Sequence, residues 1–290
     1  MSVGKTISSY LSLIKFSHTV FALPFAMIGY FLAVKITGNI LDIKKLLLIL
    51  LCMIFARSAA MAFNRYIDID FDRKNPRTTT REIPLGIISM KAASIFVIIS
   101  SVAFIIVTYF INPICLYLSP VALAVVLGYS FTKRFTALCH VILGIGLSLA
   151  PIGAYVAVTG RFDWLPLFFS FAVLFWVSGF DIIYALQDEQ FDKSQNLYSI
   201  PAWLGLRNAL ILSKIFHAIT IFFIIYAGAT SSFGIIYWFG AGFFILLLIY
   251  QHTLVRPNDL SKVNMAFATT NGIASIIFAT FTIIDLLLQK

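Results

Sequence analysis

The chain has 290 residues, of which 60% are hydrophobic, 16% are aromatic and only 11% are charged, and its formal net charge is +9. An ordinary soluble domain has a charged fraction of about 25%, so this composition excludes one. The mean hydropathy of +0.96 and the confinement of charge to short islands predict an all-α, polytopic membrane protein.

Nine apolar runs are each about long enough to cross a hydrocarbon core of roughly 30 Å as an α-helix. No polar linker divides them, so we expect one integral membrane domain over residues 1–290. The N-terminal segment lacks a compact apolar core with a small-residue cleavage site, so we expect the first span to be retained. The runs cover residues 17–34, 46–63, 92–111, 114–132, 135–159, 164–186, 208–230, 233–250 and 264–288.

Positive side chains are distributed unevenly between the two faces of the membrane. If the N-terminus is inside and nine spans alternate, fifteen Lys and Arg lie inside, five lie outside and Arg57 lies within a span. Cytoplasmic loops carry an excess of Lys and Arg, so this asymmetry predicts a cytoplasmic N-terminus and an external C-terminus. It also explains the basic net charge without a nucleic-acid partner.

The second predicted helix carries a charged island at its inner end, in the stretch NRYIDIDFDRKNPRT over residues 64–78. A residue that precedes proline disfavours the α conformation, so we expect this helix to continue as far as Asn75, before Pro76. At 100° per residue, four polar side chains then fall within a stripe of about 100°. They are Arg57, Asn64, Asp68 and Asp72.

A second polar stripe lies at the inner end of the sixth predicted helix, within about 80° of the helical wheel. Its last two acids follow those of the first stripe by 120 residues, which indicates a weak internal repeat. Both stripes lead into long polar loops, residues 65–91 and 188–207, and long loops carry function more often than short ones. The second stripe consists of Asp181, Tyr184, Asp188 and Asp192.

A lone acid at a helix end most often faces water or lipid head groups, but three features favour a functional site here. Acids four residues apart on a helix repel each other by a few tenths of a kcal/mol, so repeated Asp pairs need a compensating cation. Arg57 and Asp181 lie one to two turns deeper, where an ionised side chain costs roughly 2.5 to 3.5 kcal/mol unless it faces a partner or a polar cavity. Both stripes also enter from the same side.

The residue types in the two stripes indicate the chemistry of the ligand. Carboxylates and an amide carbonyl are hard oxygen ligands suited to Mg²⁺, which binds through one or two carboxylates together with substrate phosphates. No His or Cys joins either stripe, which argues against zinc or iron. The surrounding Lys and Arg indicate an anionic ligand. Together these features predict a diphosphate site for a substrate with a phosphorylated head and a long apolar tail.

The motifs around these stripes resemble a known family. The first stripe is followed by PRT at residues 76–78 and REIP at residues 81–84, and the second stripe follows at a long interval. This arrangement resembles the two signature motifs of the UbiA superfamily of intramembrane prenyltransferases, over nearly the whole chain. YSFTKRFT, residues 129–136, is similar to a loop of 4-hydroxybenzoate polyprenyltransferases. NPRTTTREIPLG, residues 75–86, is similar to a sub-branch often assigned to ubiquinone or futalosine-pathway menaquinone synthesis.

The resemblance implies a helical bundle around a central cavity that opens sideways to lipid and is capped by the two inside loops. One departure concerns Arg65, because the family usually has an Asp at this place. One metal ion could then have fewer protein ligands, or Arg65 could contact the diphosphate itself. Asp70 is no obvious substitute, since it lies about 200° from Asp68 on the helical wheel. The implied Mg²⁺ ligands are Asn64, Asp68, Asp72, Asp188 and Asp192.

Other polar residues have two readings each. Arg57 binds diphosphate or is a structural partner of Asp181. Lys133 and Arg134 bind the acceptor carboxylate or the diphosphate, or they are only positive-inside anchors. Asn271 and Asn264 line the cavity or make hydrogen bonds between helices. The expected substrate-binding set is Arg57, Asn64, Arg65, Arg77, Lys133, Arg134, Lys193 and Asn271, and the expected catalytic set is Asp68, Asp72, Asp188, Asp192, Asp181 and Tyr184.

The resemblance implies an Mg²⁺-dependent enzyme of the bacterial inner membrane. Its partners would be a polyprenyl diphosphate, a small aromatic acceptor and the lipid bilayer. In this reaction the allylic C–O bond ionises and an electron-rich aromatic carbon attacks the cation. Tyr184 would orient Asp188 or the acceptor, and Asp181 would polarise the acceptor hydroxyl.

Three alternatives to this function remain: a futalosine-pathway menaquinone precursor as acceptor, a haem-type or chlorophyll-type acceptor, and a secondary transporter of an anionic solute.

Overall fold

The computed structural model describes residues 3–14, 21–38 and 41–289. Within these residues the regular structure is helical, apart from an isolated β-bridge between Arg256 and Asp259. The helices are α1 Val3–Leu13, α2 Leu23–Thr37, α3 Ile43–Ile67, α4 Ile69–Lys74, α5 Met90–Tyr109, α6 Pro113–Thr132, α7 Cys139–Thr159, α8 Trp164–Ala185, the 3₁₀ turn η2 Leu186–Asp188, α9 Glu189–Ser194, α10 Ile200–Ala229, α11 Ile235–Leu254, the π-helical turn η3 Met265–Thr270 and α12 Asn271–Leu288.

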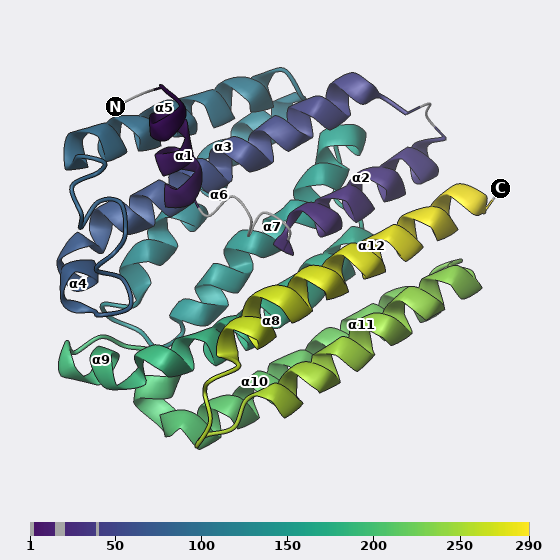
Figure 1. Ribbon diagram of the computed structural model, residues 1–290. Helices are drawn as coiled ribbons and strands as arrows, with labels where there is room; N and C mark the ends of the chain where they lie inside the picture. The colour runs from purple at the N-terminus through teal and green to yellow at the C-terminus, as the bar shows by residue number, and fades with distance from the viewer. Residues whose placement is uncertain (1–2, 15–20, 39–40, 290) are drawn as a thin grey trace.

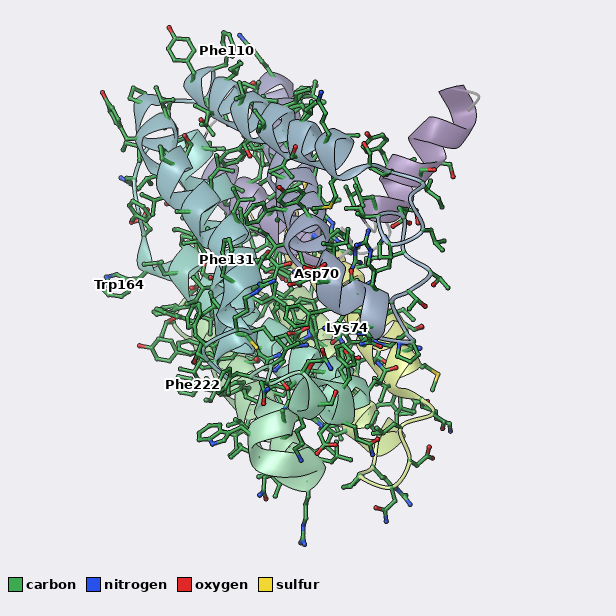
Figure 2. The ribbon with its side chains drawn as sticks, turned by 90° about the vertical axis from the view of Figure 1, so that its left-hand side faces the viewer. Asp70, Lys74, Phe110, Phe131, Trp164 and Phe222 are labelled. Atoms are coloured by element: carbon green, nitrogen blue, oxygen red, sulfur yellow. The ribbon has the colours of Figure 1, made fainter. Side chains whose placement is uncertain are left out.

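The apolar helices match the predicted spans. Among the described residues, eight helices are long and apolar enough to cross a membrane, and α2 adds a shorter apolar helix of 15 residues. The start of the first expected span, in residues 15–20, lies outside the described residues. Large apolar side chains such as Ile98, Tyr117 and Trp164 are more than half exposed on the outside of the bundle. Figure 2 shows Trp164, Phe110 and Phe222 at this periphery, as a lipid-facing surface requires.

The centre of the bundle is built around α8, which packs most extensively against α7 and α10. Trp176 of α8 is fully buried, and its ring centroid lies 5.3 Å from that of Phe25 and 5.6 Å from that of Phe244. Such aromatic pairs stabilise a core beyond the area that they bury. This core lies deeper in the bundle than the two predicted acidic rows.

Both acidic segments break their helices at the same place in the repeat. α3 ends at Ile67, and Asp68 has φ −91° and ψ 11° before α4 begins; Asp188 has φ −101° and ψ 3° before α9 begins. The prediction of one continuous helix up to Asn75 is therefore wrong at Asp68, although α4 does end before Pro76. The matching geometry supports the internal repeat, since α4 and α9 occupy equivalent positions 120 residues apart.

The two short helices lie at the same end of the bundle. In Figure 1, α4 and α9 are on the left, and the described C-terminal end of α12 is at the opposite end. The segment that follows α9 turns sharply at Gly205, whose φ of 76° and ψ of 164° divide α10 into a short first part and a long span. A side chain rarely adopts this φ, so glycine permits the turn.

The contact between α2 and α7 depends on Gly29. A Cβ atom at this position would overlap the backbone carbonyl of Pro151. We expect Gly29→Ala to lower the free energy of unfolding by about 1 to 3 kcal/mol, because the two helices must move apart. Thermal denaturation of the protein in detergent measures this change. Gly128→Ala is the matched control, since a Cβ there meets no described atom within 4 Å, and equal melting temperatures for the two variants would contradict the prediction.

Candidate active site

The two acidic segments face each other at the end of the bundle that carries α4 and α9. The amide of Asn75 donates to Asp188 Oδ1 at 3.0 Å, and Lys74 Nζ donates to Gln195 Oε1 at 3.3 Å. Figure 2 looks onto this end, with Asp70 and Lys74 on α4. The first acidic segment is thereby joined to the second.

Arg77 connects the loop after α4 to Asp188. Its Nε donates to Asp188 Oδ1 at 3.0 Å, its Nη2 contacts Oδ2, and its Nη1 donates to the Tyr184 hydroxyl at 2.8 Å. The guanidinium also stacks over the Tyr184 ring, 5.0 Å from the centroid. Burial alone would lower the pKa of Arg77, but the hydrogen bonds and the charge of Asp188 outweigh burial and raise it. A bidentate pair of this kind fixes geometry as well as charge.

Asp192 is fully buried and holds a cation from the α6–α7 loop. Lys133 Nζ lies 2.7 Å from Asp192 Oδ1, and the Ser199 hydroxyl donates to Oδ2 at 2.8 Å. Burial alone would lower the pKa of Lys133, but the charge of Asp192 and the bond to it raise that pKa above its ordinary value. The Lys133 carbonyl also accepts from the Tyr198 amide at 2.8 Å, which ties the two loops together.

The carboxylates of the first segment are paired in the same way. Arg134 Nη2 lies 2.9 Å from Asp68 Oδ1, and the Asn64 amide donates to Asp68 Oδ2 at 3.1 Å. Arg81 Nη1 lies 2.6 Å from Asp72 Oδ1. Burial raises the pKa of Asp68, and the charge of Arg134 offsets this only in part. Each of the four motif carboxylates thus has a loop cation as its partner, which supplies the compensating charge that the repeated acids require.

A single phenol links the two rows electrostatically. The charges of Asp68 on the first segment and Asp181 on the second both act on the Tyr129 hydroxyl, as do those of Arg57 and Arg65. Tyr129 lies in the YSFTKRFT segment, near the end of α6. Together with the bonds from Asn75 and Arg77 to Asp188, this indicates that the two rows lie close to each other.

One functional candidate that the sequence does not reveal is His140, which bonds to the second stripe from a different helix. His140 lies at the start of α7, and its Nδ1 is 2.7 Å from Asp181 Oδ2. Its Nε2 accepts from the Ile200 amide at 3.3 Å, so the proton lies on Nδ1 and is donated to Asp181. In sequence, His140 is an isolated polar residue in an apolar run, and nothing in its spacing connects it to Asp181.

Two expected substrate-binding residues have other partners. Asn271 is fully buried: its Oδ1 accepts from Trp176 Nε1 at 2.8 Å, and its amide donates to the Ala266 and Phe267 carbonyls. The structure therefore supports the interhelical role of Asn271 over the cavity role. Lys193 pairs with Glu189 on its own helix α9 and is half exposed, so it does not belong to the paired rows.

The donor set of the two rows fits a magnesium ion. It consists of carboxylate and amide oxygens, the ligands that Mg²⁺ prefers. Asp72 Oδ2 is buried and has no hydrogen-bond partner in the part of the chain that the structure describes, so it remains available as an acceptor. Within that part, no three His, Cys, Asp or Glu side chains form a group that could hold a metal ion, and each motif carboxylate is paired with a cation.

The fold and the site define a polytopic α-helical membrane protein with opposed, cation-paired acidic segments at one end. The model of the UbiA prenyltransferase family matches residues 22–276, and the chain belongs to this family. That makes it an enzyme of the aromatic prenyltransferase class.

Individual relatives agree with this assignment. The chain is 31% identical over 235 residues to a 4-hydroxybenzoate octaprenyltransferase of Nitrosospira multiformis, covering 81% of this chain and 80% of the relative. The apo structure of a UbiA homolog from Aeropyrum pernix K1 has a TM-score of 0.83 and 32% identity, covering 92% of this chain and 98% of the other. A UbiA homolog from Archaeoglobus fulgidus bound to GPP and Mg²⁺ shares the fold, with a TM-score of 0.73, 22% identity and 97% and 100% coverage.

The interhelical role of Asn271 can be tested by comparing its replacement with that of Asn264, an exposed asparagine seven residues earlier. We expect Asn271→Ala to lower the free energy of unfolding by about 1 to 3 kcal/mol. The Trp176 Nε1–H and the Ala266 and Phe267 carbonyls would lose their hydrogen bonds to the Asn271 side chain. The KM values for the substrates should change little. Thermal denaturation and steady-state kinetics measure both quantities, with Asn264→Ala as control. A raised KM at unchanged stability would return Asn271 to the substrate-binding set.

Proposed function

We propose that this enzyme transfers a polyprenyl group from a polyprenyl diphosphate to an aromatic carbon of a 4-hydroxybenzoate-like acceptor, in quinone biosynthesis. The observation that carries the proposal is the pair of opposed acidic rows with basic loops between them. Such an arrangement suits a divalent cation and a diphosphate together. The name of the Nitrosospira relative supports the acceptor, and the GPP and Mg²⁺ bound to the Archaeoglobus homolog support the donor and the metal.

The residues proposed to hold Mg²⁺ are Asn64, Asp68, Asp72, Asp188 and Asp192. When bound, Mg²⁺ supplies Lewis-acid stabilisation of the negative charge that develops on the leaving diphosphate. Each carboxylate would then bind the metal with one oxygen and give up part of its ion pair with a loop cation. Arg77, Lys133 and Arg134, released from full pairing, would contact the diphosphate oxygens.

The remaining polar residues are proposed to position the acceptor. Asp181 Oδ2 accepts a hydrogen bond from His140 Nδ1, which leaves Oδ1 to accept a hydrogen bond from the hydroxyl of the aromatic substrate. Tyr184 is held by Arg77 at its hydroxyl and stacks on Phe267 with a centroid distance of 4.2 Å, so it forms a rigid aromatic wall. Arg57 is the deepest cation of the first row and would bind diphosphate or an acceptor carboxylate. The lipid-embedded bundle would keep water away from the allylic cation.

Two other acceptors and one other protein class are alternatives to this function. A futalosine-pathway menaquinone precursor or a haem-type ring would use the same diphosphate site, and only the acceptor pocket would differ. A transporter of an anionic solute would have helices broken near the membrane midplane. Here the breaks at Asp68 and Asp188 lie at one end of the bundle, which favours the enzyme.

The orientation of the protein in the membrane is part of the proposal. We place the end with α4 and α9 at the cytoplasmic face of a bacterial inner membrane, because the positive loop residues gather there. The N-terminus is then cytoplasmic and the C-terminus external. The diphosphate head would enter from the cytoplasm while the prenyl tail stays in the bilayer.

Substitution of one carboxylate in each row tests the proposed site. We expect Asp68→Ala and Asp188→Ala each to lower turnover by roughly a hundredfold or more, because charge stabilisation of the leaving group is lost. Turnover is measured on purified protein in detergent with Mg²⁺, a radiolabelled polyprenyl diphosphate and 4-hydroxybenzoate. Asp70→Ala is the matched control on the exposed side of α4 and should retain activity. Wild-type turnover in both site variants, at unchanged elution on size exclusion, would refute the assignment.

Removal of magnesium tests the cofactor separately. We expect EDTA to abolish product formation and added Mg²⁺ to restore it, since the diphosphate would otherwise leave without charge neutralisation. The same radiolabel assay gives the readout, and Ca²⁺ added in place of Mg²⁺ tests the choice of ion. Undiminished prenylation in excess EDTA would show that the protein's own cations suffice. Solute flux in proteoliposomes without any product would instead indicate the transporter.

A further inference from the structure

Arg65 occupies a buried position beside the first acidic row. It lies in the last turn of α3, its residue is only 5% exposed, and it follows Asn64 directly. The break at Asp68 separates it from Asp72, which lies on α4, so its relation to Asp72 comes from the contacts of the fold and not from the helical period. Arg65 is therefore buried at the end of α3 that leads into the first acidic segment.

Arg65 has no counterion of its own. Each of the four loop cations in the site contacts one motif carboxylate, whereas no ion pair among the described residues involves Arg65. Its Nε is buried without a hydrogen-bond partner in the same part of the chain. A buried charge is normally paired, because the loss of hydration is otherwise uncompensated. Arg65 is thus a buried cation that the four ion pairs of the motif carboxylates leave uncompensated.

The neighbours of Arg65 increase this surplus of positive charge. The acid whose charge acts on it most strongly, Asp72, already bonds to Arg81 at 2.6 Å. The like charge of Arg81 acts on Arg65 more strongly than the opposite charge of Asp72 does. The charge of Arg65 also acts on the Tyr129 hydroxyl, as do the charges of Asp68 and Asp181. The uncompensated charge is therefore buried directly beside Asn64, one of the residues proposed to hold Mg²⁺.

We propose that Arg65 is a fixed cation that binds the diphosphate head of the substrate directly. This inference rests on the proposed function and adds a specific binding residue to it. A prenyl diphosphate carries more negative charge than one Mg²⁺ ion neutralises, and Arg65 supplies part of the remainder without having to leave a carboxylate. Its planar N–H groups match the oxygens of a phosphate group. It differs in this respect from the loop cations, which must first give up their partners.

A purely structural role for Arg65 makes the opposite prediction about stability. In that case the charge would hold the cap in place through Asp72 and Glu82, whose charges both act favourably on it. Replacement by a neutral side chain would then destabilise the protein. If Arg65 instead awaits an anion, a neutral side chain removes an unpaired buried charge and stabilises the ligand-free protein.

The test compares Arg65→Met with Arg73→Met in the full-length protein. Methionine keeps an unbranched apolar stem of similar length, and Arg73 is exposed on α4, so the control loses the same charge outside the site. Thermal denaturation without ligand and calorimetric binding of inorganic diphosphate in Mg²⁺ give the two readouts. We expect Arg65→Met to raise the melting temperature and to weaken diphosphate binding by roughly ten- to a hundredfold. Arg73→Met should leave the binding unchanged.

The outcomes separate this inference from the proposed function. If the wild-type protein binds diphosphate and Arg65→Met binds it equally well, Arg65 is not a ligand and the inference fails while the diphosphate site stands. A lowered melting temperature together with unchanged affinity would establish the structural role. If the wild-type protein itself does not bind diphosphate in Mg²⁺, both the inference and the proposed function fail.

Discussion

The pairing of four buried or half-buried carboxylates with four loop cations is the interaction on which the architecture of the site depends. Asp68, Asp72, Asp188 and Asp192 sit at the end of a bundle whose outer surface is apolar, where unpaired charge is costly. Removing one partner from a buried pair costs about 3 to 5 kcal/mol, because the remaining charge is left uncompensated. The cations come from the loops, so the same pairs that satisfy the acids also hold the loops over the site.

The helix breaks explain how two transmembrane helices present their acids to one another. α3 ends directly before Asp68, and α8 passes through the 3₁₀ turn η2 to Asp188; each of these Asp residues is non-helical and precedes a short helix, α4 or α9. A straight helix would carry the second acid of each pair out along its own axis toward solvent. The breaks keep Asp72 and Asp192 buried, at 5% and 0% exposure, within reach of Arg81 and Lys133.

Several polar residues outside the rows serve the bundle rather than the site. Trp176 and Asn271 join α8 to the π-helical turn before α12, where a π-turn leaves carbonyls that the Asn271 amide satisfies. A polar group in an apolar interior must find such a partner. The same requirement applies to Asp181, whose partner His140 comes from a different helix. An intramembrane polar residue therefore indicates a partner, and only the contacts decide whether that partner is protein or ligand.

The sequence by itself determined the helical membrane fold and the two acidic rows. Apolar runs of span length and the helical period act locally along the chain, so composition and spacing were enough to find them. Only the tertiary structure decided the partners: His140 for Asp181, Trp176 for Asn271, and a separate loop cation for each motif carboxylate. These contacts join residues far apart in sequence, and their distances depend on how whole helices pack, which no local period specifies.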